Sequence, residues 1–169
     1  MTSPVGPQML ERLLSEHGAA LELFAGQWSR RPDDCVQEAF LALVRQQTLP
    51  DRIVPWLYRV VRNQAISEAR SAHRRRRHET IAAAMNESWF VANGDPGQTL
   101  AVTEALEAVT DEEREIIVAR IWGRLTFEEV AEVLDISKSA AHRRYERGLS
   151  HLRERLGESW IAKNNSTTN

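Results

Sequence analysis

Apolar residues recur at three- and four-residue steps along almost the whole chain, and this spacing constrains the fold more than any other feature of the sequence. Such spacing places apolar side chains along one side of an α-helix. β-branched residues never alternate with polar residues over a length sufficient for a strand. The sequence therefore predicts an all-α fold.

Breaks in this pattern divide the chain into two small helical domains. The chain has 169 residues, of which 42% are apolar, so two small cores can form. Between residues 80 and 98 the helical spacing fades, and the turn-forming sequences Asn-Gly and Asp-Pro-Gly appear. We expect a three- or four-helix domain over residues 1–79, a flexible linker over 80–98, a helix-turn-helix domain over 99–158 and a disordered tail over 159–169.

Several expected helices begin with capping residues. Thr110 with Glu113, and Thr126 with Glu129, fit the capping box, in which hydroxyl and carboxylate each accept a hydrogen bond from a free backbone N–H. Each such cap is worth about 1 kcal/mol. The other candidate caps are Asp33 or Asp34 for the second helix and Ser137 for the last helix.

Opposite charges are concentrated in two segments, although the net charge of the chain is only −2. Residues 52–78 contain eight arginines and one glutamate, about +7, whereas residues 111–134 contain seven acids and three arginines, about −4. Such segregation is typical of a protein that presents one face to phosphates and another to a different partner.

Residues 126–156 have the pattern of a helix-turn-helix. A helix over 127–134 is followed by the short turn Asp135-Ile136 and by a helix from Lys138 that has one apolar side. Its other side carries arginines near the helix start, where a recognition helix enters the major groove and guanidinium groups bind guanine edges. We predict contact with duplex DNA; a solvated amphipathic helix is the alternative.

A second basic surface is expected on the third helix. Arg59, Arg62 and Asn63 follow Trp56 closely, and aromatic rings beside hydrogen-bonding and cationic groups can hold unstacked bases. For Trp56 itself we expect a core position rather than a stacking platform. The arginines at 74–77 alone would also fit a solvated helix end, a nuclear-localisation patch or a phosphate clamp.

No catalytic, metal or cofactor site is expected. The sequence has no Ser/His/Asp set, glycine-rich phosphate loop or metal-ligand spacing. A single cysteine, Cys35, excludes an internal disulfide and fits a reducing cytoplasm. No segment resembles a membrane span or a signal sequence, so we expect a cytoplasmic protein without membrane insertion.

Three stretches resemble conserved regions of the sigma-70 family. They read DDCVQEAFLALV at 33–44, PWLYRVVRNQAISEAR at 55–70 and EALEAVTDEEREIIVARIWGRLTFEEVAEVLDISKSAAHRRYERGLSHLRERL at 104–156. The first two resemble region 2 and the third resembles region 4, in the compact extracytoplasmic-function (ECF) form. Gly148 stands where the family usually has alanine, at a cost of about 1 kcal/mol in a helix.

The resemblance implies a transcription initiation factor that binds core RNA polymerase and directs it to specific promoters. Its implied partners are the largest-subunit coiled coil and flap region of the polymerase, and promoter DNA; an anti-sigma factor is left open. Two alternatives from other classes are a stand-alone helix-turn-helix regulator and a regulatory protein that mimics a sigma factor.

The resemblance also implies a role for each matching residue. The residues implied in binding core polymerase are Asp34, Gln37, Glu38 and Leu41. Those implied in binding the melted minus-ten element are Arg52, Arg59, Arg62, Asn63, Arg70, Arg74 and Arg75. Those implied in reading the duplex minus-thirty-five element are Ser137, Lys138, Ser139, His142, Arg143, Arg144 and Arg147.

Overall fold

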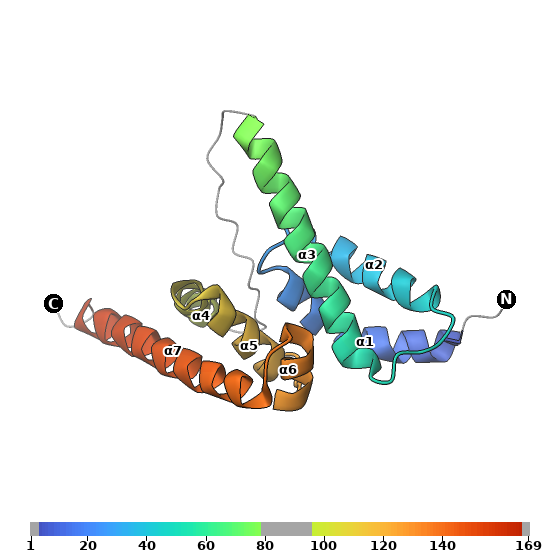
Figure 1. Ribbon diagram of the computed structural model, residues 1–169. Coiled ribbons are helices and arrows are strands. Elements are labelled where there is room, and N and C mark those ends of the chain that lie inside the picture. The colour runs from blue at the N-terminus through green and yellow to red at the C-terminus, as the bar shows by residue number, and fades with distance from the viewer. Residues whose placement is uncertain (1–3, 79–95, 167–169) are drawn as a thin grey trace.

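The computed structural model describes residues 4–78 and 96–166, and within them every regular element is a helix, as the periodicity predicted. The seven helices of this part are α1 (Pro7–Ala25), α2 (Pro32–Val44), α3 (Ile53–His78), α4 (Pro96–Ala108), α5 (Asp111–Ile121), α6 (Phe127–Leu134) and α7 (Lys138–Ser166). The first three helices and the last four form two groups that lie against each other, with α6 beside the first part of α3 (Figure 1).

The N-terminal group is a bundle in which α1, α2 and α3 all contact one another. Pro7 and Pro32 stand in the first turns of α1 and α2, where a helix does not use the backbone N–H that proline lacks. Neither Asp33 nor Asp34 caps α2, because the capping position is Arg31 and no side chain caps that helix. Both aspartates lie in the first turn, where negative charge favours the positive end of the helix dipole.

In the C-terminal group, α4, α5 and α6 all pack on α7. Both predicted capping boxes are confirmed. The Glu113 N–H donates to Thr110 Oγ1 at 3.2 Å, and the Glu129 N–H donates to Thr126 Oγ1 at 3.2 Å. The glutamate side chains accept from the backbone N–H of the two threonines in return, so α5 and α6 begin at fixed residues.

The predicted helix-turn-helix is formed by α6 and α7. Asp135 ends α6 in the left-handed conformation, with φ of 53°, and so turns the chain sharply toward α7. Ser137 caps α7, since its Oγ accepts a hydrogen bond from the Ala140 N–H at 3.1 Å. These local features fix where α6 ends and where α7 begins.

Two boundaries differ from the sequence prediction. α4 begins at Pro96, inside the range assigned to the linker, because proline is favoured in the first turn of a helix. α7 continues through Ser166 although a disordered tail was expected from residue 159; no proline or glycine occurs over 158–166 to end the helix. The remainder of the expected linker, residues 80–95, and residues 167–169 lie outside the described residues.

The two helical groups share a buried apolar core. Phe24 of α1 and Tyr58 of α3 belong to the same cluster as Val118 and Ala119 of α5. The ring centroids of Phe24 and Tyr58 are 5.1 Å apart, and the Tyr58 hydroxyl would lie 2.6 Å from a Cβ built at Gly123. A glycine at this position therefore allows α3 to approach the end of α5 closely.

A helix able to cross a lipid bilayer would have to be both long and apolar, and none of the described helices meets both conditions.

Candidate interaction surfaces

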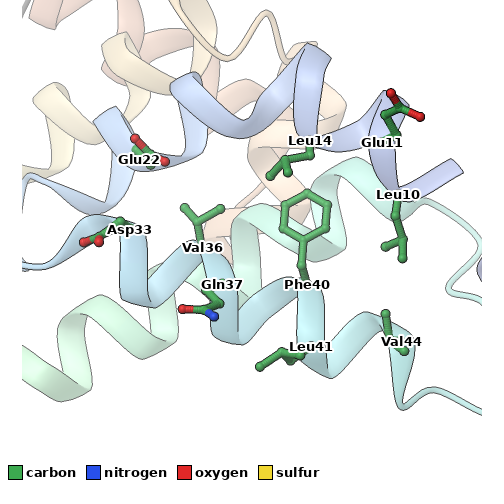
Figure 2. Close-up of a pocket in the computed structure, with 10 residues that line it drawn as sticks. All are labelled: Leu10, Glu11, Leu14, Glu22, Asp33, Val36, Gln37, Phe40, Leu41 and Val44. Atoms are coloured by element: carbon green, nitrogen blue, oxygen red, sulfur yellow. The ribbon is translucent and has the colours of Figure 1, made fainter. Parts of the chain in front are cut away.

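An apolar groove of about 420 Å³ lies between α1 and α2 (Figure 2). Leu14 and Leu41, which are 54% and 39% exposed, contribute apolar surface to it. Phe40 points from α2 toward Leu14, and Glu22 and Asp33 lie at one end of the groove. An apolar floor with acidic residues at its edge suits an amphipathic segment that carries basic side chains.

The four residues expected to bind polymerase share one exposed side of α2. Their spacing of three, four and seven residues places them on a single helix face. Gln37 and Leu41 line the apolar groove, and Gln37 also lines a neighbouring polar depression of about 390 Å³ with Asp34 and Glu38. Asp34 forms an ion pair with Arg31 at 3.1 Å. The structure therefore brings the predicted set together as one surface that is apolar on one side and acidic on the other.

Cys35 lies in the same polar depression but is buried. Its Sγ is 3.6 Å from Glu68 Oε2, which also accepts a hydrogen bond from the Ser29 hydroxyl. Burial raises the pKa of the Cys35 thiol, and the Glu68 carboxylate raises it further. Because the thiolate is the reactive form, this environment makes Cys35 a packing residue. Over the residues described, no three or more His, Cys, Asp and Glu side chains form a group that could hold a metal ion.

A polar pocket of about 390 Å³ lies along α3. It is lined by Arg62, Asn63, Ile66, Ser67, Arg70 and Arg74. Asn63 is exposed, and Arg74 Nη2 donates to Ser71 Oγ at 3.0 Å. A carboxamide beside guanidinium groups can hydrogen-bond a base edge and the adjacent phosphates. Arg75 is also exposed but does not line the pocket.

The other basic residues of the α3 surface bind acidic residues of the C-terminal group. Arg52 donates through Nη1 to Glu132 Oε2 at 3.2 Å, and its Nη2 lies 3.2 Å from Glu129 Oε1. Arg59 Nη2 donates to the backbone carbonyl of Glu132 at 2.7 Å and lies 3.7 Å from its carboxylate. α6 therefore lies over part of the surface that the sequence assigned to DNA.

Arg62 and Glu115 form the most buried pair between the two groups. The Glu115 side chain is 7% exposed and the Arg62 side chain is 27% exposed. Burial raises the pKa of the Glu115 carboxyl, and the hydrogen bond and charge of Arg62 oppose this rise. Because an unpaired buried charge is strongly unfavourable, each of these side chains depends on the other in this arrangement.

The start of α7 forms a shallow depression of about 340 Å³. It is lined by Phe127, Lys138, Ser139, His142 and Arg143. The His142 ring lies against Phe127 with centroids 4.9 Å apart, and Lys138 Nζ is 2.5 Å from Glu128 Oε1. Ser139 and Arg143 are exposed. Four of the residues predicted to read duplex DNA therefore meet at one end of the recognition helix.

Two further arginines of α7 bind acids of α5. Arg144 Nη1 is 3.4 Å from Glu112 Oε2, and Arg147 Nε donates to Glu113 Oε1 at 2.8 Å. The Glu113 side chain is only 1% exposed, and its Oε2 is 3.0 Å from His151 Nδ1. Burial acts to raise the pKa of Glu113, but hydrogen bonds from His151, Arg147 and the helix cap hold it below its ordinary value of 4.5. Arg147 thus stabilises the packing of α7 on α5, which the sequence did not predict.

Sequence reasoning missed the acidic partners of the α3 arginines. The opposite charges of residues 52–78 and 111–134 were visible, but they were interpreted as faces for two different partners. The structure instead places acids from the second segment against arginines from the first. The structure also adds Leu10 and Leu14 of α1 to the groove beside α2. Leucines in excess of those needed for the buried side of a helix, such as Leu14 and Leu41, are the sequence signal that could have shown this groove.

Both helical groups match families of known proteins. Residues 13–75 match the family model for sigma-70 region 2, and residues 105–154 match the model for sigma-70 region 4. Over 159 residues the chain is 29% identical to the RNA polymerase sigma factor CarQ of Myxococcus xanthus, with 88% of this chain and 89% of that protein covered.

Two solved structures have a similar fold. The sigma factor RpoE in complex with the anti-sigma factor NepR from Bartonella quintana gives a TM-score of 0.71 at 20% identity, covering 90% of this chain and 98% of that one. CnrH in complex with the cytosolic domain of CnrY gives a TM-score of 0.65 at 24% identity, covering 90% of each chain.

The fold, the helix-turn-helix and the paired matches define a transcription initiation factor. The chain belongs to the sigma-70 family, in the ECF form that carries regions 2 and 4. This confirms the resemblance found in the sequence. The matches support a sigma factor and give no support to a stand-alone DNA-binding regulator.

Proposed function

We propose that three surfaces divide the work of promoter-directed initiation. The exposed side of α2 docks on the coiled coil of the largest subunit of core RNA polymerase, α3 holds the melted minus-ten strand, and the start of α7 reads the minus-thirty-five duplex. The carrying observation is that members of each set line one depression of the surface: Asp34, Gln37 and Glu38 on α2, Asn63, Arg70 and Arg74 on α3, and Lys138, Ser139, His142 and Arg143 on α7.

The docking surface on α2 has the chemistry for a basic, partly apolar partner. Asp34 and Glu38 supply negative charge, and Leu41 supplies exposed apolar area beside the groove. Charge complementarity sets orientation and association rate, while burial of apolar area supplies affinity. The polymerase flap is the proposed contact of the second domain, residues 99–158.

The minus-ten surface combines base capture with phosphate contacts. Asn63 is placed to hydrogen-bond the edge of an unstacked base, and Arg70, Arg74 and Arg75 supply cations for the strand backbone. Capture of an unstacked base by the protein offsets part of the few kcal/mol that unstacking costs. We therefore assign melting to binding alone, without catalysis by this chain and without a cofactor.

The minus-thirty-five surface reads DNA through the start of α7. Ser139, His142 and Arg143 are exposed there, and Ser137, Lys138 and Arg144 are assigned to phosphates or to the edge of the site. Arg147 can contact DNA only through its terminal Nη1 and Nη2 groups, because its Nε donates a hydrogen bond to Glu113.

An anti-sigma factor is a further proposed partner. RpoE, whose fold is similar, was solved in complex with an anti-sigma factor. The groove between α1 and α2 offers such a partner an apolar site next to the polymerase-docking residues. We place the protein in the cytoplasm, because polymerase and promoter DNA are its proposed partners.

Co-elution with core polymerase tests the docking surface. The full chain is mixed with sigma-free bacterial core RNA polymerase and run on gel filtration. The double variant Asp34→Arg with Glu38→Arg should lose co-elution, because both acids would be replaced by charges of the same sign as the partner's. The control, Glu16→Arg, reverses the charge of an exposed acid of α1 that lies outside both proposed polymerase contacts, and it should co-elute like the unmodified chain. Equal co-elution of both variants would remove the docking role from α2.

A further inference from the structure

The contact between the two helical groups occupies one particular part of the DNA-binding surface. Arg52, at the entrance to α3, and Arg59 and Arg62 within it all bind the C-terminal group. The remaining assigned residues, Asn63, Arg70, Arg74 and Arg75, are exposed and lie along α3 beyond these pairs. Arg52 and Arg59 remain 43% and 47% exposed, so the minus-ten surface is divided into a half whose guanidinium groups are paired with the C-terminal group and a half that is open.

The covering residues resemble nucleic acid in the groups that they present. Glu115 comes from α5, and Glu129 and Glu132 come from α6, so three carboxylates face the three arginines. Carboxylate and phosphate oxygens bind guanidinium groups with the same geometry and charge. A guanidinium nitrogen that donates to a carboxylate or to the carbonyl of Glu132 cannot donate to a phosphate at the same time.

Apolar contact holds these charges in register. The core cluster continues from α1 and α3 into α5 and α6, and the Tyr58 hydroxyl fits against Gly123. Exposed ion pairs alone are weak, whereas pairs at the edge of a buried apolar contact are held in a fixed geometry. A DNA strand cannot pass between α3 and α6 while this contact is intact.

We propose that α5 and α6 act as an intramolecular mask of the minus-ten surface, in which Glu115, Glu129 and Glu132 take the place of the DNA strand on Arg52, Arg59 and Arg62. This inference rests on the assignment of α3 to minus-ten DNA. The free chain is closed and binds single-stranded DNA poorly. Core polymerase, by holding the two groups at separate sites, removes the mask and exposes the complete surface.

A double variant tests the mask on the free, full-length chain. Glu129→Gln with Glu132→Gln removes two masking carboxylates, and glutamine at 129 still accepts the capping hydrogen bond from the Thr126 N–H. The control, Glu104→Gln with Glu107→Gln, makes the same change in net charge on exposed residues of α4, which packs on α7. Circular dichroism establishes that both variants fold.

The measurements are the anisotropy of a fluorescein-labelled oligothymidylate and the radius of gyration from X-ray scattering, both without polymerase. The masking variant should bind the oligonucleotide about five-fold more tightly than the control, because each partly exposed pair is worth up to about a factor of five. Its radius of gyration should also be larger. Equal affinity of the two variants overturns the mask, whether or not the radius changes.

A charge exchange separates masking from a general effect of charge. Glu132→Arg should increase the radius of gyration, because it places like charges against Arg52 and Arg59. Adding Arg59→Glu should restore the compact form, and failure to restore it would overturn the pairing. Both measurements use the free chain without polymerase. Absence of co-elution with core polymerase would therefore contradict the proposed docking surface on α2, whereas the mask is tested by the affinity for DNA and the radius of gyration.

Discussion

Gly148 lies where α7 packs on α5, and a Cβ built on it would be 3.0 Å from both Glu113 Cβ and Ile117 Cδ1. Glu113 cannot easily move, because it is buried and hydrogen-bonded to Arg147, His151 and its own helix cap. The glycine that departs from the family pattern therefore permits a close helix contact and a buried carboxylate beneath the recognition helix.

Replacement of this glycine should lower stability despite the higher helix propensity of alanine. Gly148→Ala gains about 1 kcal/mol of propensity. It loses about 2 kcal/mol to overpacking against Glu113 and Ile117, so the free energy of unfolding should fall by roughly 1 kcal/mol. Gly157→Ala is the matched control on the same helix, where a Cβ would meet nothing within 4 Å. It should raise the free energy of unfolding by about 1 kcal/mol.

Urea denaturation followed by circular dichroism measures both glycine variants. Stabilisation of Gly148→Ala equal to that of Gly157→Ala would contradict the close contact between α7 and α5.

At the scale of the helix, one part of α7 packs on α5, and its start, which we propose reads DNA, is exposed. Arg147 binds buried Glu113 and so belongs with the packing side, whereas Arg143 is exposed beside the depression at the helix start. Arg144 lies between these roles, since it is 30% exposed and pairs with Glu112. Of the arginines on this helix, Arg143 is therefore the best placed to reach base edges in the major groove.

Arg143→Ala should reduce sequence-specific reading of the upstream element. With holoenzyme and a promoter obtained by selection from a random library, affinity for the selected minus-thirty-five duplex should fall about ten-fold, the range for loss of a bidentate guanine contact. Affinity for a scrambled duplex should stay the same. Arg153→Ala, an exposed arginine farther along α7, is the control and should affect neither DNA. Equal weakening on both duplexes would make Arg143 a phosphate contact.

The helices themselves could be predicted because their signals are local. Apolar spacing gave the all-α fold, and the hydroxyl and carboxylate pairs at Thr110 and Thr126 marked the starts of α5 and α6. The predicted end of α7 was wrong, because the polar residues after Trp160 were interpreted as disorder, although no proline or glycine over 158–166 ends the helix. The sets of candidate site residues came from the resemblance to the sigma-70 family, whose motifs are local, since each set lies on one helix or its entrance.

At the scale of the whole molecule, the contact between the two groups could not be predicted. Arg52 and Glu132 are 80 residues apart, and no local pattern links them. Charge segregation showed that each segment needed a partner of opposite sign, but not that the partner was in the same chain. Shape decides this: α5 and α6 fit against α3 because Gly123 leaves room for Tyr58.

The buried pair Arg62 and Glu115 gives the whole-molecule arrangement a pH dependence that can be measured. Arg62→Met should lower the free energy of unfolding by about 3 kcal/mol at neutral pH, because it leaves the buried Glu115 carboxylate without a partner. The pKa of Glu115 is already raised by burial, and loss of Arg62 should raise it further. A carboxyl whose pKa is higher in the folded state than in the unfolded state binds its proton more tightly when the protein is folded. The free energy of unfolding therefore falls as pH rises from the unfolded-state pKa through the folded-state pKa, and it is recovered as pH falls back to the unfolded-state pKa.

The loss in free energy of unfolding caused by Arg62→Met should therefore be smaller at about pH 5 than at neutral pH. At neutral pH an unpaired, charged Glu115 either stays buried at a cost in free energy or reaches water by separation of the two groups. Guanidinium denaturation of both chains at each pH measures this difference. Arg70→Met removes an arginine from the same helix that forms no pair with the C-terminal group, and its effect should be within about 0.5 kcal/mol at either pH. A deficit of Arg62→Met that is constant with pH would show that Glu115 does not depend on Arg62 for its charge, and that the apolar contact alone holds the two groups together.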